Sequence, residues 1–127
     1  MIVDSSALLA IVLRENGWEA LVDKLSAEPA GAGAPTLAEA GMVLTARLGA
    51  RGRSLLARVV QEARIEVVPF TDAHWPIAID AYARFGKGRH AAGLNFGDCL
   101  TYAVARVAGQ PLLYVGEDFA RTDLPRA

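Results

Sequence analysis

Cysteine and histidine are scarce in this 127-residue sequence. The single cysteine, Cys99, cannot form a disulfide within the chain, and its place in an apolar helical pattern predicts a small buried side chain. The two histidines, His74 and His90, are well separated, and no CxxC or HExxH pattern occurs. Walker, GxGxxG and nucleophile-elbow motifs are missing as well. The sequence therefore predicts neither a zinc site nor a disulfide-stabilised fold.

Long apolar runs and a strong net charge are also lacking. No segment approaches the roughly 20 apolar residues that span a bilayer. The short apolar run 7–13 follows Asp4, where a signal peptide would carry positive charge. We therefore expect a cytoplasmic protein that makes no membrane contact. The net charge of −1 does not by itself indicate nucleic-acid binding, which is typical of basic domains.

What the sequence contains is sufficient for one folded domain over residues 1–127. Hydrophobic residues make up 53% of the chain and charged residues 21%, which are ordinary values for a globular protein. Short apolar runs predict strands at 1–3, 65–70 and 112–115, and residues 29–35 predict a loop with a weak strand in it. Helical apolar spacing recurs between these runs. Strands that alternate with helices predict an α/β domain with a mainly parallel sheet.

Four acidic residues fall where predicted strands end or helices begin. Asp4 follows the first strand and Asp118 the last, while Glu39 and Asp98 lie in the first turns of helices. In a parallel sheet these positions share one edge, where ligands bind. Packed carboxylates repel one another unless a cation is shared, and Mg²⁺ prefers oxygen ligands. The pattern therefore predicts a divalent-metal site at this edge.

Each of these acids also has a purely structural interpretation. Asp4 could cap the first helix, and Asp118 could lie in an ordinary turn. Thr36 and Glu39 fit a capping box for a helix that starts at Thr36. Asn95 is a predicted helix cap, and Asp98 lies three residues after it in the first helical turn, where an acid is favourable in any helix. The metal-site hypothesis thus depends on the set of four and not on any one member.

The ordered motifs resemble those of a PIN domain. The segments that carry the resemblance are Asp4-Ser5-Ser6-Ala7, Glu39, Asn95-Phe96-Gly97-Asp98-Cys99 and Gly116-Glu117-Asp118-Phe119. More narrowly, nearly the whole chain resembles the VapC-type toxins of bacterial toxin–antitoxin pairs, and residues 82–99 are its most specific stretch. Glu117 is a departure, because many relatives carry Asn at that position. The resemblance implies a three-layer α/β/α domain with a mainly parallel central sheet.

The resemblance also implies an acidic Mg²⁺ site, with Mn²⁺ as the alternative ion, formed by Asp4, Glu39, Asp98 and Asp118. Asp4 and Asp98 would be the direct ligands. Glu39 and Asp118 would complete the shell, bind a second ion or orient water. Ser6 would hydrogen-bond a carboxylate and hold its conformation.

The activity implied by the resemblance is endoribonuclease cleavage of RNA. Metal ions would activate a water and neutralise charge on the attacked phosphate. Attack by water should leave 5′-phosphate and 3′-hydroxyl ends. The resemblance further implies a homodimer and a cognate VapB-type antitoxin, whose C-terminal segment would lie in a groove near the apolar helices that follow the first strand.

Two stretches of the chain hold basic residues and no acid, between Glu39 and Glu62 and between Asp80 and Asp98. Such stretches are often solvated helix faces and loops. An acidic site, however, repels RNA phosphates unless nearby cations attract them. The second stretch precedes the helix of Asp98 and is the better candidate for RNA contact, through Lys87, Arg89 and His90. The first stretch contributes Arg47, Arg51, Arg53 and Arg58.

Two other interpretations fit parts of the sequence. A catalytically degenerate PIN module would bind only RNA or a protein partner, and the presence of all four acids argues against it. A phosphate-handling receiver domain has similar length and a doubly wound sheet. It would need paired acids after the first strand and a lysine after the last, and this sequence has only Asp4 and no lysine near Asp118.

Overall fold

The computed structural model covers residues 1–127 and has a four-stranded sheet at its centre. The strands lie in the order β3-β2-β1-β4, and every neighbouring pair is parallel. Their bounds are β1 (Ile2–Val3), β2 (Gly31–Gly33), β3 (Glu66–Val68) and β4 (Leu112–Leu113). The predicted α/β class with a parallel sheet is confirmed.

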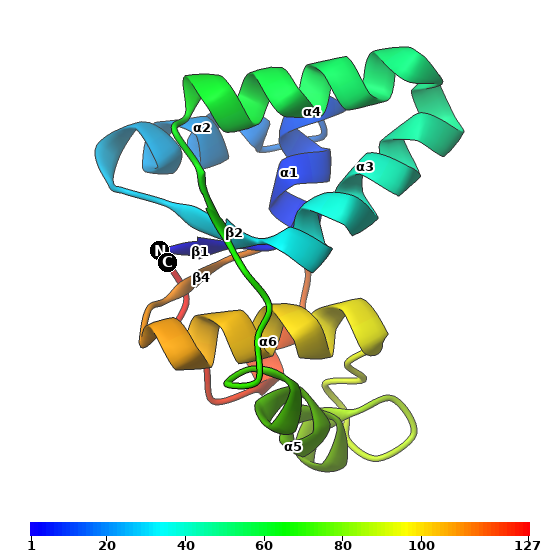
Figure 1. Ribbon diagram of the computed structural model, residues 1–127, viewed down its shortest axis with the longest axis vertical. Helices are drawn as coiled ribbons and strands as arrows, with labels where there is room; N and C mark the ends of the chain where they lie inside the picture. Colours follow the sequence, from blue (N-terminus) through cyan, green and yellow to red (C-terminus); the bar gives the residue numbers. More distant parts are fainter.

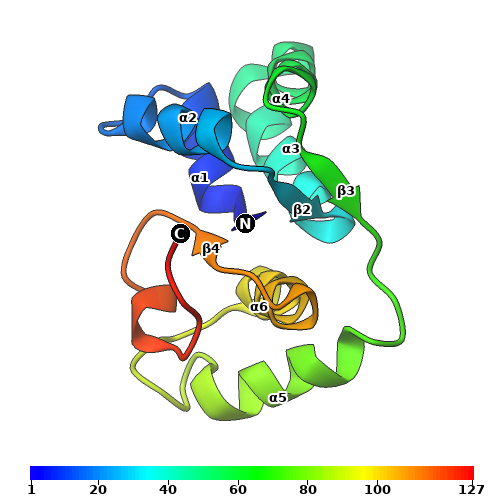
Figure 2. The same cartoon turned by 90° about the vertical axis from the view of Figure 1, so that its left-hand side faces the viewer.

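Helices cover both faces of the sheet and complete three layers (Figure 1). Four lie on one face: α1 (Ser5–Val12), α2 (Trp18–Ala27), α3 (Ala34–Leu48) and α4 (Ala50–Glu62). The other face carries α5 (Trp75–Phe85) and α6 (Phe96–Ala108), and a short 3-10 helix, η1 (Phe119–Arg121), follows β4. Figure 2 shows the same separation from a second direction. No helix is long and apolar enough to cross a membrane.

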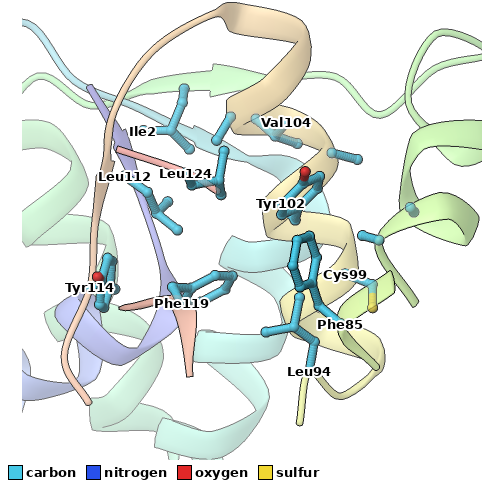
Figure 3. Close-up of a cluster of buried hydrophobic side chains, with 14 of the residues drawn as sticks. Ile2, Phe85, Leu94, Cys99, Tyr102, Val104, Leu112, Tyr114, Phe119 and Leu124 are labelled. Carbon is cyan, nitrogen blue, oxygen red and sulfur yellow. The ribbon is translucent and has the colours of Figure 1, made fainter. Parts of the chain in front are cut away.

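The core is divided in two by the sheet, and alternate strand residues enter each half. Ile2 and Leu112 point into the cluster against α5 and α6, shown in Figure 3, whereas Val3 and Leu113 point into the cluster against α1 to α4. This alternation is the period of two that a strand imposes on its side chains. Cys99 belongs to the first cluster and is buried, as its apolar setting predicted.

The strands differ from their predicted bounds for local reasons. The strand predicted at 65–70 ends at Val68, because Pro69 has no backbone N–H to donate to the sheet. The weak strand within 29–35 is β2, which lies between β1 and β3. The glycine at position 33 lets β2 pack closely against α6, since a Cβ on Gly33 would lie 3.0 Å from the Val104 side chain.

The capping box predicted for Thr36 and Glu39 is wrong. Helix α3 begins two residues earlier, at Ala34, and Gly33 takes the cap position without a side-chain hydrogen bond. Pro35 lies in the first turn, where its fixed φ suits a helix and its missing N–H costs nothing. Thr36 is therefore inside the helix, and Glu39 has no capping role.

Candidate acidic site at the carboxyl edge of the sheet

Asp4 lies at the point where β1 gives way to α1, and the residue is buried, with 2% relative exposure. The Oδ2 atom accepts hydrogen bonds from the Ser6 amide at 3.0 Å and the Ser6 hydroxyl at 2.6 Å. The Oδ1 atom is buried and has no hydrogen-bond partner. A buried carboxylate oxygen without a partner is costly unless a cation or a ligand compensates it. Asp4 thus caps its helix with one oxygen and keeps the other available.

Asp98 is held by a capping box at the start of α6. Its backbone amide donates to Asn95 Oδ1 at 2.9 Å, and the Asn95 amide donates to Asp98 Oδ2 at 3.1 Å. The predicted cap at Asn95 is confirmed. The box holds the side-chain conformation of Asp98 and leaves its Oδ1 atom outside the two bonds.

Glu39 extends from α3 to the first turn of α6. Its carboxylate lies so close to Gly97 that a Cβ built on that glycine would come within 2.8 Å of Glu39 Cδ and 2.9 Å of Oε1. Two helices that are far apart in the sequence therefore bring Glu39 next to Asp98. Only the missing side chain of Gly97 makes this approach possible.

Asp118 is exposed in the loop between β4 and η1. The residue after it, Phe119, is buried and packs against Tyr114, so the loop is anchored directly beside the acid. Its carboxylate lies near enough to Asp98 to act on the charge of that group. The four acids predicted from sequence thus share one edge of the sheet.

Burial and the charges of the other three acids both act on the Asp98 carboxyl group. Burial raises the pKa of Asp98 from 3.8 to about 6, against the opposing hydrogen bond from the Asn95 amide. The negative charges of Asp4, Asp118 and Glu39 raise it further. Repulsion of this kind is relieved by a bound cation.

The donor set fits a hard divalent cation that retains water. Nowhere do three His, Cys, Asp or Glu side chains converge closely enough to hold one ion between them. Mg²⁺ commonly uses only one or two carboxylates and completes its octahedron with water and substrate phosphate. Such a requirement is matched by two oxygens: the Asp4 Oδ1 atom, which has no hydrogen-bond partner, and the Asp98 Oδ1 atom, which takes no part in the capping box.

The sequence matches the family model of the PIN domain over residues 1–124. The chain belongs to the PIN domain family. This PIN domain is 48% identical over 129 residues to VapC ribonuclease Mb2004c of Mycobacterium bovis and to Ribonuclease VapC36 of Mycobacterium tuberculosis, with 98% of the chain and 91% of each relative covered. It is 39% identical to Ribonuclease VapC of Mycolicibacterium smegmatis, with coverage of 98% and 97%.

A solved structure agrees with the fold. The crystal structure of Mycobacterium tuberculosis VapC20, described as a sarcin-ricin loop cleaving toxin, superimposes with a TM-score of 0.79. The match covers 99% of the PIN domain and 97% of that chain at 18% sequence identity. At this identity the likeness supports the fold alone.

Ser6 connects two parts of the acidic edge in the PIN domain. Its hydroxyl donates to Asp4 Oδ2, as the resemblance to PIN domains implied, and accepts a hydrogen bond of 3.0 Å from the Val115 amide. The second bond joins α1 to the loop that carries Asp118. No local pattern in the sequence indicates this link, because Ser6 and Val115 are 109 residues apart.

The basic residues predicted to contact RNA lie in the loop between α5 and α6. Lys87, Arg89 and His90 are all exposed there. The Arg89 guanidinium lies 5.1 Å from the centre of the Tyr82 ring, and His90 Nδ1 accepts a hydrogen bond from the Ala92 amide. The loop leads directly to Asn95 and Asp98, so these three side chains come just before the acidic edge along the chain.

Arg121 was not singled out from the sequence, yet it links two loops of the site. Its guanidinium donates to the Ala91 carbonyl at 3.0 Å, which joins η1 to the basic loop. The other basic stretch lies on α3 and α4. Arg47 is about 12 Å along the α3 axis from Glu39 at 1.5 Å per residue, and Arg58 is paired with Glu62 at 2.8 Å.

The raised pKa of Asp98 predicts a measurable titration in the metal-free PIN domain. Since its folded pKa exceeds its unfolded pKa, protonated Asp98 favours the folded state. That stability is present below about pH 4 and is lost as the pH rises through about 6. We expect the Asp98 carboxyl carbon to titrate in NMR with a midpoint near 6, and at lower pH in a Glu39→Gln variant, which removes one repelling charge. A midpoint near 4 in the parent would contradict this.

Proposed function

We propose that this PIN domain is a metal-dependent endoribonuclease that acts as the toxin of a toxin–antitoxin pair. The observation that carries the proposal is the unpartnered, buried Asp4 Oδ1 atom beside Asp98, whose charge is opposed by three neighbouring carboxylates. Such a site favours a divalent cation over an empty state. The ribonuclease names of relatives at 48% identity support the same reaction.

The four acids divide into two pairs in the proposed reaction. Asp4 and Asp98 would hold Mg²⁺, or Mn²⁺ in its place. When bound, the ion supplies charge neutralisation at the phosphate and lowers the pKa of a coordinated water. Glu39 and Asp118 accept hydrogen bonds from water and orient it. Ser6 holds the Asp4 carboxylate in one conformation through its 2.6 Å hydrogen bond.

The basic loop accounts for how an acidic edge could accept RNA. Phosphates are repelled by four carboxylates, and exposed cations nearby offset that repulsion. Lys87, Arg89 and His90 are exposed in the loop that precedes Asp98. We propose that they bind the RNA backbone next to the cleaved bond.

Cleavage of RNA by the purified chain tests the proposed function. We expect cleavage in Mg²⁺ or Mn²⁺ that stops with a chelator and leaves 5′-phosphate ends. The control is Asp98→Asn, which keeps an oxygen to accept from the Asn95 amide and should therefore fold. Unchanged cleavage by this variant, or cleavage in excess chelator, would reject the proposed chemistry. RNA binding without any cleavage would favour the alternative, a catalytically degenerate PIN module.

An apolar groove supports the proposed antitoxin partner. It lies between α1, α2 and α4 and has a volume of about 480 Å³. Its lining includes Ile11, Trp18, Val22, Leu55 and Val59. We propose that the C-terminal segment of a VapB-type antitoxin binds there. A Val22→Glu variant should bind the antitoxin at least about tenfold more weakly but cleave RNA normally. The control Val107→Glu, an exposed residue of α6 outside the groove, should leave both antitoxin binding and RNA cleavage unchanged. Equal antitoxin affinity would argue for another surface.

A second apolar hollow supports the proposed homodimer. Between α5 and the start of α6, an open space of about 680 Å³ is lined by Trp75, Ile79, Tyr82 and Phe96. Phe96 is 80% exposed, and apolar side chains gathered in this way usually mark an interface. We propose that two copies of the chain meet at this hollow.

Ile79→Lys should shift the chain from a dimer to a monomer in sedimentation measurements. A parent chain that is already monomeric at micromolar concentration would remove this proposal.

A further inference from the structure

A buried pair of hydroxyl groups joins the two helices that carry Glu39 and Asp98. The Thr36 Oγ1 atom on α3 lies 2.9 Å from the Thr101 Oγ1 atom on α6. The two residues are 3% and 1% exposed and 65 positions apart in the sequence. A hydrogen bond between two such side chains, sealed from solvent, is held without competition from water.

The pair lies one helical turn from each acid. Thr36 precedes Glu39 by three residues on α3, and Thr101 follows Asp98 by three residues on α6. Residues three apart share a helix face. The hydroxyl contact therefore lies beside the place where the Glu39 carboxylate meets Gly97.

The hydroxyl groups let the helices approach more closely than apolar groups would. Two oxygens in a hydrogen bond are 2.9 Å apart here, whereas two methyl carbons rest at about 3.5–4.0 Å. Valine has the shape of threonine, so a valine pair at these positions would push the helices apart locally by roughly 1 Å. A displacement of about 1 Å at a reacting centre can lower a rate by about 100-fold.

We propose that Thr36 and Thr101 are positioning residues that set the separation between Glu39 and Asp98. This inference rests on the proposed function, because it assigns the spacing a role in RNA cleavage. Neither threonine touches the substrate. Their contribution is the short contact that holds α3 and α6 at the distance the two carboxylates need.

Stability measurements separate the hydrogen bond from simple packing. A single Thr36→Val or Thr101→Val change leaves the other hydroxyl buried without its partner, so the Tm should fall by about 5 °C. The double valine variant leaves no unpaired hydroxyl, so its Tm should return to within about 2 °C of the parent. A double variant that is less stable than both single variants would overturn the pairing argument.

Kinetics then test the positioning role in the folded double variant. We expect kcat for RNA cleavage to fall by roughly 10–100-fold, with KM within about threefold, because the basic loop is untouched. The matched control is the double serine variant, which keeps both hydroxyls and should stay within about threefold of the parent kcat. Parent-like kcat in the valine pair, or equal loss in the serine pair, overturns the inference.

Binding of Mn²⁺ alone distinguishes this inference from the proposed function. If the parent chain cleaves no RNA, the proposed function fails. The Mn²⁺ affinities of the same variants still test whether the threonine pair sets the spacing of the Glu39 and Asp98 carboxylates. The valine pair should bind Mn²⁺ about tenfold more weakly and the serine pair as tightly as the parent. Equal Mn²⁺ affinity in all three proteins overturns the positioning role.

Discussion

Replacement of Asp4 by Asn is expected to lower kcat for RNA cleavage by roughly 1000-fold. Asn retains the oxygen that accepts from the Ser6 amide and hydroxyl, so the helix cap should survive. What is lost is the negative charge of the buried oxygen that has no partner. The neutral amide is a poor ligand for a hard cation.

The same substitution should not destabilise the metal-free protein. The parent carries a buried carboxylate oxygen without compensation, which costs stability. Addition of Mg²⁺ or Mn²⁺ should raise the Tm of the parent through binding linkage but leave that of Asp4→Asn unchanged. Asp80→Asn on the exposed face of α5 is the control and should respond to metal like the parent. A parent-like metal response in Asp4→Asn would show that Asp4 is not a ligand.

Replacement of Gly97 by Ala should lower kcat by roughly 100-fold. The new Cβ would collide with the Glu39 carboxylate. Because this carboxylate ends a flexible side chain, it can rotate away at little cost to folding. Alanine also favours a helix over glycine by about 0.5–1 kcal/mol. Activity should therefore fall while the Tm stays equal or rises.

Two further variants make the Gly97 prediction specific. Gly41→Ala also replaces a helical glycine, but its Cβ would meet only the Leu56 side chain, at 3.6 Å, so activity should not change. Combining Gly97→Ala with Glu39→Asp shortens the colliding side chain and should recover part of the lost kcat. If Gly97→Ala cleaves RNA as fast as the parent, Glu39 is not needed where the structure places it.

Asp4 and Asp98 could be located from sequence because their positions depend on local rules. A capping residue after an apolar run marks the end of a strand and the start of a helix. Asn95 and Asp98 form the box that their spacing predicts, and Asp4 caps α1. The shared edge then follows from the parallel sheet, in which all strand ends meet on one side.

The prediction at Thr36 was wrong because two local rules competed. Thr36 and Glu39 match the capping pattern, yet Pro35 is better placed in a first turn and Gly33 can occupy the cap. Burial against α6 then gives the Thr36 hydroxyl another partner, Thr101, instead of a backbone amide. No pattern within α3 alone could reveal this partner.

By itself, the sequence predicted an α/β domain with a parallel sheet and four acids at one edge of it, since periodicity and capping act over a few residues. The three layers were implied by the resemblance to PIN domains. The tertiary structure decided how the acids are held. Glu39 rests on Gly97, Ser6 reaches Val115 and Arg121 reaches Ala91. These contacts join residues between 30 and 109 positions apart. They depend on the placement of packed elements to within a few tenths of an ångström, which no residue pattern along the chain encodes.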